Sequence, residues 1–154
     1  MQLPQDLPDE FRVYGNPGAG VNQYGTPAAM GVIGAASHAW TADGRAPFYV
    51  GDMSNSTGTD YGHTPGGDHT TGTGIDIRPV RKDGRNEGTN YNDPSYDREA
   101  TQRLVDTLRA TGAVKDIFFD DAQISGVRSL GPKYPHANHL HVRVDPDWQR
   151  PLAK

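Results

Sequence analysis

Cysteine is absent from the 154 residues of this chain. The fold therefore depends neither on disulfide bonds nor on a cysteine-based metal site. Long hydrophobic runs are also absent, so we expect no transmembrane span. The beginning of the chain lacks a basic start followed by an apolar stretch, and we therefore expect no signal peptide. The patterns Ser-x-x-Lys and Gly-x-Ser-x-Gly are missing, which argues against a serine nucleophile.

A strong excess of charge is missing as well, because the formal net charge at pH 7 is only −4. No basic patch is large enough to suggest nucleic acid as a partner. Hydrophobic residues make up 34% of the chain, which also contains 19 glycines and 12 prolines. This composition favours a single domain in which long, ordered loops surround a small sheet.

Histidine is concentrated in one segment, Pro135–Val144, which contains three of the six histidines. His139, His141 and Arg143 alternate there with apolar residues, and this period of two predicts a strand with one apolar face. His139 and His141 then share a face, about 6.6 Å apart along the backbone. Such a pair can bind one metal, or one imidazole can bind while the other transfers a proton. A surface strand that carries polar side chains outward is the alternative.

A second strand pattern surrounds Asp76. Isoleucines alternate with Asp76 and Arg78, so the two charged side chains share the face opposite the isoleucines. His69 precedes Asp76 by seven residues, and Gly72 and Gly74 between them argue against a helix. We expect a turn in which the glycines supply unusual backbone angles and fold His69 back over Asp76.

The two segments together offer two imidazoles and one carboxylate, from His69, Asp76 and His141. That is the ligand set of a catalytic zinc, which keeps its fourth position for water. A buried aspartate is costly without a partner, and a metal ion is one candidate partner. An ion pair between Asp76 and Arg78, or another nearby basic residue, is the alternative.

These residues resemble the signature of a group of zinc peptidases. The pair His69-x6-Asp76 and His139-Leu-His141 is similar to the motifs that unite lysostaphin-type enzymes, D-alanyl-D-alanine peptidases and the hedgehog fold. The pattern His136-x-x-His139-x-His141 resembles more closely the penicillin-insensitive murein endopeptidases. The runs Val50–Ser54 and Ile117–Asp121 are also similar to that branch, and the resemblance covers roughly Phe48 to Arg143.

The resemblance implies a role for each of these residues. His69, Asp76 and His141 would bind Zn²⁺, and His139 and His136 would be the catalytic pair beside the metal-bound water. It also implies an α+β fold of the hedgehog and D-Ala-D-Ala peptidase type. In that fold a small antiparallel sheet carries the metal site, flanked by two or three helices and long Gly/Pro-rich loops.

The activity implied is that of a zinc metallopeptidase that hydrolyses D-Ala–meso-diaminopimelate cross-links in peptidoglycan. Peptidoglycan stem peptides, which carry carboxylates, would be the substrate, and Arg78, Arg143 and Tyr134 are candidates for binding them. Two related cleavages remain open, those of a D,D-carboxypeptidase and of an L-alanyl-D-glutamate endolysin. A non-catalytic wall-binding module that keeps zinc for structure is a further alternative.

Without a signal peptide, we expect synthesis in the cytoplasm and action on the cell wall in the periplasm. The protein would arrive there through phage lysis, as an endolysin, or through a secretion system, as an antibacterial effector. The sequence leaves the delivery machinery, any immunity partner and the oligomeric state open.

The remaining pattern predicts the elements around this site. Residues 1–25 are interpreted as an extended arm, 26–146 as the peptidase domain and 147–154 as a tail. We expect a helix over 27–40, a short strand over 48–52, a helix that starts at 93–95 and ends at Gly112, and a strand over 114–120. His38 is interpreted as an ordinary residue of the first helix, and the role of His63 stays open.

Overall fold

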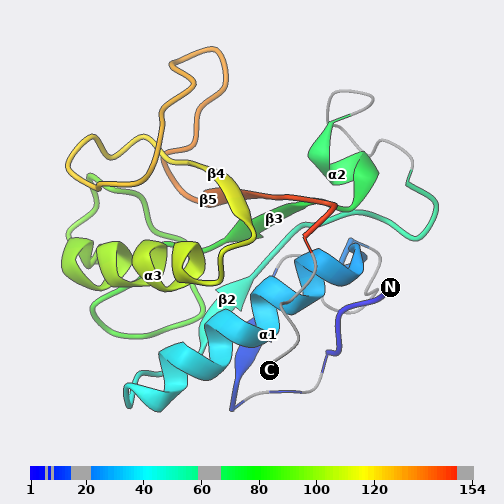
Figure 1. Cartoon of the computed structure of the whole chain (residues 1–154). Helices are drawn as coiled ribbons and strands as arrows, with labels where there is room; N and C mark the ends of the chain where they lie inside the picture. Colours follow the sequence, from blue (N-terminus) through cyan, green and yellow to red (C-terminus); the bar gives the residue numbers. More distant parts are fainter. Residues whose placement is uncertain (6, 8, 15–21, 59–66, 149–154) are drawn as a thin grey trace.

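The computed structural model describes residues 1–5, 7, 9–14, 22–58 and 67–148 of the chain. His63 and the end of the expected tail, from residue 149 onward, lie outside the described residues. The described part is a small α+β structure with a five-stranded sheet (Figure 1). Its elements are β1 (Phe11–Val13), α1 (Pro27–Ala42), β2 (Phe48–Val50), α2 (Asp68–Thr71), β3 (Gly74–Ile77), α3 (Arg98–Ala110), β4 (Val114–Phe118) and β5 (Leu140–Val144).

The sheet has the strand order β1-β2-β3-β5-β4 and is mixed rather than antiparallel throughout. The pairs β2–β3, β3–β5 and β4–β5 are antiparallel, as expected, but β1 runs parallel to β2. β1 comes from the segment that the sequence suggests is an extended arm, and Leu3 and Phe11 of that segment are buried. The sequence did not predict this edge strand. Its three residues are too few to show a period of two, and the surrounding prolines and glycines suggested an irregular segment.

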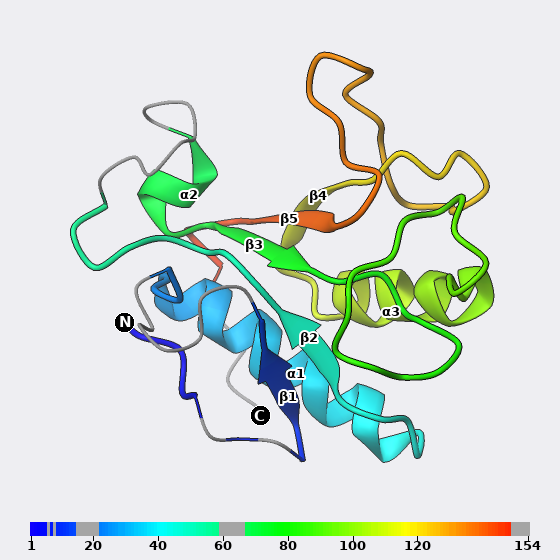
Figure 2. The same ribbon diagram turned by 180° about the vertical axis from the view of Figure 1, so that it is seen from behind.

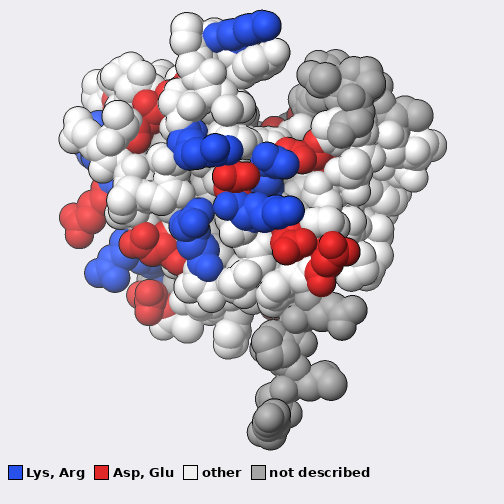
Figure 3. Space-filling model, turned by 45° about the horizontal axis from the view of Figure 1, so that its top comes forward, with Lys and Arg blue, Asp and Glu red and all other residues white. Residues whose placement is uncertain are grey.

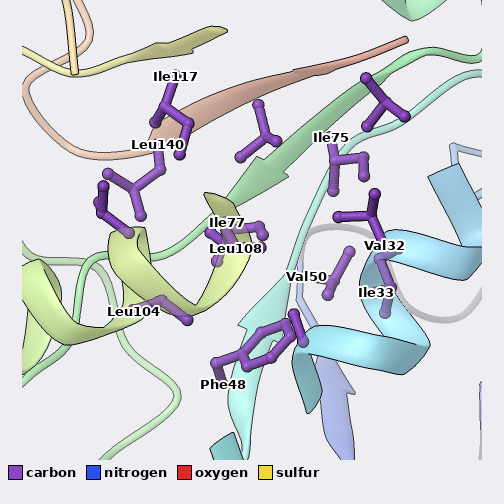
Figure 4. Packing of buried hydrophobic residues seen from close by; sticks show 14 of the residues in the cluster. Val32, Ile33, Phe48, Val50, Ile75, Ile77, Leu104, Leu108, Ile117 and Leu140 are labelled. Atoms are coloured by element: carbon purple, nitrogen blue, oxygen red, sulfur yellow. The ribbon is translucent and has the colours of Figure 1, made fainter. Parts of the chain in front are cut away.

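The hydrophobic core lies on one side of the sheet, where α1 and α3 cover it (Figures 1 and 2). Strand side chains alternate between faces, so every second residue of β3 and β5 points into this core. Each fully buried aliphatic side chain contributes about 1.5–3 kcal/mol. Figure 4 shows side chains of both helices and of four strands meeting there, among them Val32, Ile33, Phe48, Val50, Ile75, Ile77, Leu104, Leu108, Ile117 and Leu140.

Helix α1 begins where the sequence predicts. The Thr26 side chain accepts a hydrogen bond from the backbone N–H of Ala29, and Pro27 occupies the first turn, where its missing N–H is not needed. The helix continues to Ala42, two residues beyond the predicted end. His38 is exposed on this helix, as expected for a residue without a role in the site.

Helix α3 begins later than predicted. Asp93 does not cap it but accepts a hydrogen bond from the backbone N–H of Ser95, which closes a turn. Asp97 is the capping residue, because its side chain accepts the N–H of Ala100. The predicted end is confirmed, since Gly112 follows the helix with a φ of +80°.

The loop between β4 and β5 is attached to α3 through one buried carboxylate. Asp121 is 2% exposed and accepts hydrogen bonds from the hydroxyl of Tyr96 at 2.9 Å and from Nε of Arg98 at 2.7 Å. Its other oxygen accepts the backbone N–H of Gln123. Burial opposes ionisation of Asp121, but these hydrogen bonds outweigh it and hold the pKa of Asp121 below its ordinary value.

Asp121→Ala is therefore expected to lower the free energy of unfolding by about 2 kcal/mol at pH 7, because the buried hydroxyl of Tyr96 and the guanidinium of Arg98 lose their acceptor. Since the folded-state pKa is depressed, the contribution is complete above the unfolded pKa of about 3.9 and is lost as pH falls further. Urea unfolding at pH 7 and pH 3 measures both effects. The exposed Asp106→Ala is the matched control and should change stability by less than about 0.5 kcal/mol. An equal loss for Asp121→Ala at both pH values would contradict this account.

Candidate metal centre

Two neighbouring strands place an aspartate and a histidine side by side on the face opposite α1 and α3. β3 pairs with β5 in a register that sets Asp76 opposite His141. Because the residues on either side of each are buried in the core, both side chains project to the other face. Helix α2 and the loop between β4 and β5 rise on that same side of the sheet (Figures 1 and 2).

His69 comes from α2, a helix of a single turn, whereas the sequence argued against a helix in this segment. Gly72 ends the turn with a φ of +74°, so a glycine supplies the unusual backbone angle, as expected. Gly74 is also required, because a Cβ there would lie 2.9 Å from the Cβ of Asp68 and 3.2 Å from Cε1 of His141. Because Gly74 has no Cβ, α2 can lie close over β3 and β5.

Three possible metal-ligand atoms converge at this place. Those of His69, Asp76 and His141, called here the metal group, lie within 4.8 Å of one another. Oδ1 of Asp76 is 3.4 Å from Nε2 of His69 and 2.9 Å from Nδ1 of His141. Ligand atoms of a tetrahedral zinc are about 3.4 Å apart, because each lies about 2.0–2.2 Å from the ion. The metal group could therefore hold a metal ion.

The opposite nitrogen of each histidine in the metal group already has an acceptor. Nδ1 of His69 donates to the carbonyl oxygen of Met53. Nε2 of His141 lies 3.2 Å from Oδ2 of Asp68. Such partners fix the tautomer of a metal-binding histidine and turn its lone pair toward the ion. The donor set and its outer partners thus fit a divalent metal with nitrogen and oxygen ligands.

Electrostatics of the metal group follow from its burial and its short contacts. Burial opposes ionisation of Asp76, but hydrogen bonds with His141 and His69 outweigh it and hold the pKa of Asp76 well below its usual range. Burial alone lowers the pKa of His141, yet the hydrogen bonds to Asp68 and Asp76 raise it to about 9. His141 between two carboxylates is therefore a cation in the metal-free protein, which compensates the buried negative charge.

Asp68 also connects the metal group to a chain of ion pairs. Its Oδ2 lies 3.0 Å from Nε of Arg143, and Arg143 in turn contacts Asp116, which pairs with Arg128. The hydrogen bond to His141 and the charge of Arg143 hold the pKa of Asp68 below its ordinary value. Arg143, a candidate for substrate binding, thus pairs with two aspartates. Basic side chains with acidic ones among them gather over the middle of one face (Figure 3).

Two further histidines lie beside the metal group. Nε2 of His139 is 3.9 Å from Oδ1 of Asp76, and the rings of His136 and His139 are 4.9 Å apart. Nδ1 of His139 lies 2.8 Å from Oδ1 of Asn138, and Nδ1 of His136 lies 2.8 Å from the carbonyl oxygen of Tyr134. When Nδ1–H of each histidine donates to this oxygen, Nε2 carries the lone pair and can accept a proton.

Burial lowers the pKa of His136 and that of His139, although the negative charge of Asp76 partly opposes this for both. Both imidazoles are therefore mainly neutral at pH 7, the form that accepts a proton. A neutral imidazole next to a cluster of possible metal ligands can act as a general base and then as a general acid.

Asp120 fixes the position of His136. Its Oδ2 accepts the backbone N–H of His136 at 2.7 Å, and its Oδ1 accepts the hydroxyl of Ser129 at 2.6 Å. Phe118 closes one side of the site, because its ring stacks on His141 at 5.9 Å and lies 5.8 Å from His136. The end of β4 and the loop after it thus position the second pair of histidines.

Sequence reasoning missed several of these supporting residues. Asp68, Asp120 and Asn138 each hold a histidine, yet none was named as a residue of the site, although Asp120 lies in the run Ile117–Asp121 that contributes to the resemblance. Asp68 and Asn138 stand immediately before His69 and His139, and this adjacency was the only available signal. Tyr134, a candidate for substrate binding, is 51% exposed and lies next to Lys133, whose ammonium is 5.4 Å from its ring.

No protein-family model matches this chain, and no curated protein matches it. Within the described residues, no helix combines the length and the apolar character needed to cross a membrane.

Proposed function

We propose that this chain is a zinc-dependent peptidase with a fold of the hedgehog and D-Ala-D-Ala peptidase type. One observation carries the proposal: one ring nitrogen of His69 and one of His141 face the same carboxylate oxygen of Asp76, while their other nitrogens are engaged by outer acceptors. Two nitrogens and one carboxylate oxygen are the protein ligands of many catalytic zinc sites, which leave a fourth position open. His139 and His136 beside the metal group favour catalysis over a structural metal.

Each residue has a task in peptide hydrolysis. When bound, zinc supplies a Lewis acid that polarises the scissile carbonyl and makes a water molecule more acidic. His139 would accept the proton of the attacking water at Nε2, because Nδ1–H is held by Asn138. The same nitrogen, or that of His136, would return the proton to the leaving amine. Asp120 would keep His136 within reach during this step.

The substrate that we propose is the D-Ala–meso-diaminopimelate cross-link of peptidoglycan. The resemblance of His136-x-x-His139-x-His141 to the murein endopeptidases supports this choice. The location of the metal group also supports it, since the group lies on the face of the sheet opposite α1 and α3, and a cavity lined by Asp76 and His139 opens beside it (Figures 1 and 2).

Digestion of purified cross-linked muropeptide dimers, followed by mass spectrometry, tests this proposal. We expect the zinc-loaded protein to convert dimers to monomers by cutting between D-Ala and meso-diaminopimelate. A zinc chelator should abolish the cleavage. A β-lactam should leave it intact, because the proposed mechanism uses no serine nucleophile that a β-lactam could acylate. His141→Ala at the same concentration is the control for contaminating peptidases.

Other outcomes would assign a different function. Surviving dimers together with monomers that lose D-Ala would indicate a D,D-carboxypeptidase. A cut between L-Ala and D-Glu would indicate an endolysin of that specificity. Intact peptidoglycan in the presence of stoichiometric zinc would refute the peptidase and leave a wall-binding module that keeps zinc for structure.

A further inference from the structure

A small cavity opens beside the metal group. Its volume is about 230 Å³, and its lining includes Asp76 and His139 together with Tyr14, Asp52, Arg78, Gly88 and Asn138. The lining thus combines one metal-group residue and one candidate catalytic residue with side chains that have no part in the proposed proton transfer. Arg78 is the only cation among these lining residues.

Arg78 is held rigidly at this cavity. Its backbone N–H donates to the carbonyl of Tyr49, which continues the strand pattern and keeps Arg78 on the same face as Asp76. Its guanidinium carbon lies 4.0 Å from the centre of the Tyr14 ring, within the range of a cation–π contact. On another side Gly88 approaches so closely that a Cβ there would be 3.3 Å from a terminal nitrogen of Arg78.

Within the part of the chain that the structure describes, no acidic side chain pairs with the guanidinium of Arg78. Its Nε is buried without a hydrogen bond, and no carboxylate of the described residues forms an ion pair with Arg78. Arg143, the other candidate for binding substrate, pairs with Asp68 and Asp116 instead. A half-buried guanidinium fork that is held in place and has no carboxylate partner among the described residues suits a planar anion that arrives from outside.

We propose that Arg78 and the face of Tyr14 form a subsite for a carboxylate of the substrate, next to the metal group. This inference rests on the proposed peptidase function and adds the chemical feature that the site selects. We assign to this subsite the carboxylate on the carbon bonded to the leaving nitrogen. Arg78 is two residues from Asp76 on one strand face, about 6.6 Å along the backbone, so its guanidinium lies near the atoms that react at the metal group. The subsite would orient the leaving residue, while Asp52 on the same cavity discourages a second carboxylate.

A binding experiment tests the subsite without any cleavage. N-acetyl-D-alanine and N-acetyl-D-alaninamide differ only in the carboxylate, and NMR titration of the protein as purified gives the affinity of each. We expect the acid to bind at least about 10-fold more tightly, with a shift of the Arg78 Nε–H signal. Arg78→Met should reduce the affinity for the acid to that for the amide. Equal affinities in the wild-type protein would overturn the inference.

A cleavage experiment measures the same selectivity. Two synthetic cross-link peptides would carry either a free carboxylate or a carboxamide on the leaving residue. The wild-type protein should favour the carboxylate roughly 10- to 100-fold in kcat/KM, the range expected for hydrogen bonds to a charged group. Arg78→Met should lose this preference, so that its kcat/KM values for the two peptides become equal.

Controls keep the two proposals distinguishable. Arg85→Met removes an arginine whose side chain is 69% exposed outside the cavity, and its preference should equal that of the wild-type protein. If Arg78→Met does not fold, Arg78→Lys must lower the preference, since lysine lacks the planar fork; an unchanged preference overturns the inference. Equal cleavage of both peptides refutes the subsite and leaves the peptidase. Selective binding of the acid without cleavage of either peptide refutes the peptidase and leaves the subsite.

Discussion

His141→Ala is expected to be purified without stoichiometric zinc. The substitution removes one of the three proposed ligand atoms and leaves Asp76 and Asp68 without the imidazole that lies between them. Loss of an outer partner of a metal ligand weakens metal binding by about 10- to 100-fold, and loss of the ligand itself should exceed that range. Elemental analysis of the dialysed protein, with zinc titration against a competing chelator, measures stoichiometry and affinity.

Two variants calibrate this result. His38→Ala removes an exposed histidine of α1 and should bind zinc like the wild-type protein. Asp68→Ala keeps the three ligands but deletes the acceptor at Nε2 of His141, so its affinity should lie between those of the wild-type protein and His141→Ala. Zinc retained by His141→Ala at wild-type stoichiometry and affinity would show that the ion binds elsewhere.

His139→Ala should separate catalysis from metal binding. The variant keeps all three ligand atoms, so its zinc content is expected to remain that of the wild-type protein. Its turnover of muropeptide dimers should fall by about 10²- to 10⁴-fold, the usual contribution of general acid–base catalysis. Initial rates at saturating substrate, together with zinc analysis of the same sample, provide the comparison.

His136→Ala completes this comparison. Its ring lies 4.9 Å from that of His139, and turnover should also fall, because one of the two nitrogens that can move the proton is lost. Wild-type turnover by both single variants would assign the acid–base role to another residue. Loss of zinc from His139→Ala would instead make His139 a metal ligand.

Much of the metal group could be predicted because period-two patterns specify which side chains share a strand face. The alternation around Asp76 and around His141 is confirmed, and the pairing of β3 with β5 sets these two residues opposite each other. The caps at Thr26 and Gly112 were equally predictable, since each depends on residues within a few positions. Local rules were therefore sufficient for these elements.

The features that were missed depend on distant contacts. β1 forms because it pairs with the edge of β2, which lies more than thirty residues later in the chain. No local sequence pattern predicts this pairing. Asp68 acts through His141, which is 73 residues away in sequence. The turn of α2 is stabilised in part by the backbone N–H of Thr26, which donates to the carbonyl of Gly72. Such long-range contacts cannot be predicted from the local patterns of one sequence.

The place of β5 in the sheet has a consequence for a chain made from its N-terminus on the ribosome. β5 comes after the other described strands in sequence, yet it lies inside the sheet, between β3 and β4. Until β5 has emerged, β4 has no neighbour on that side, and His69 and Asp76 lack the third residue of the metal group. The nascent polypeptide thus cannot complete the metal group, and the insertion of one strand joins the two parts of the sheet and assembles the site in the same step.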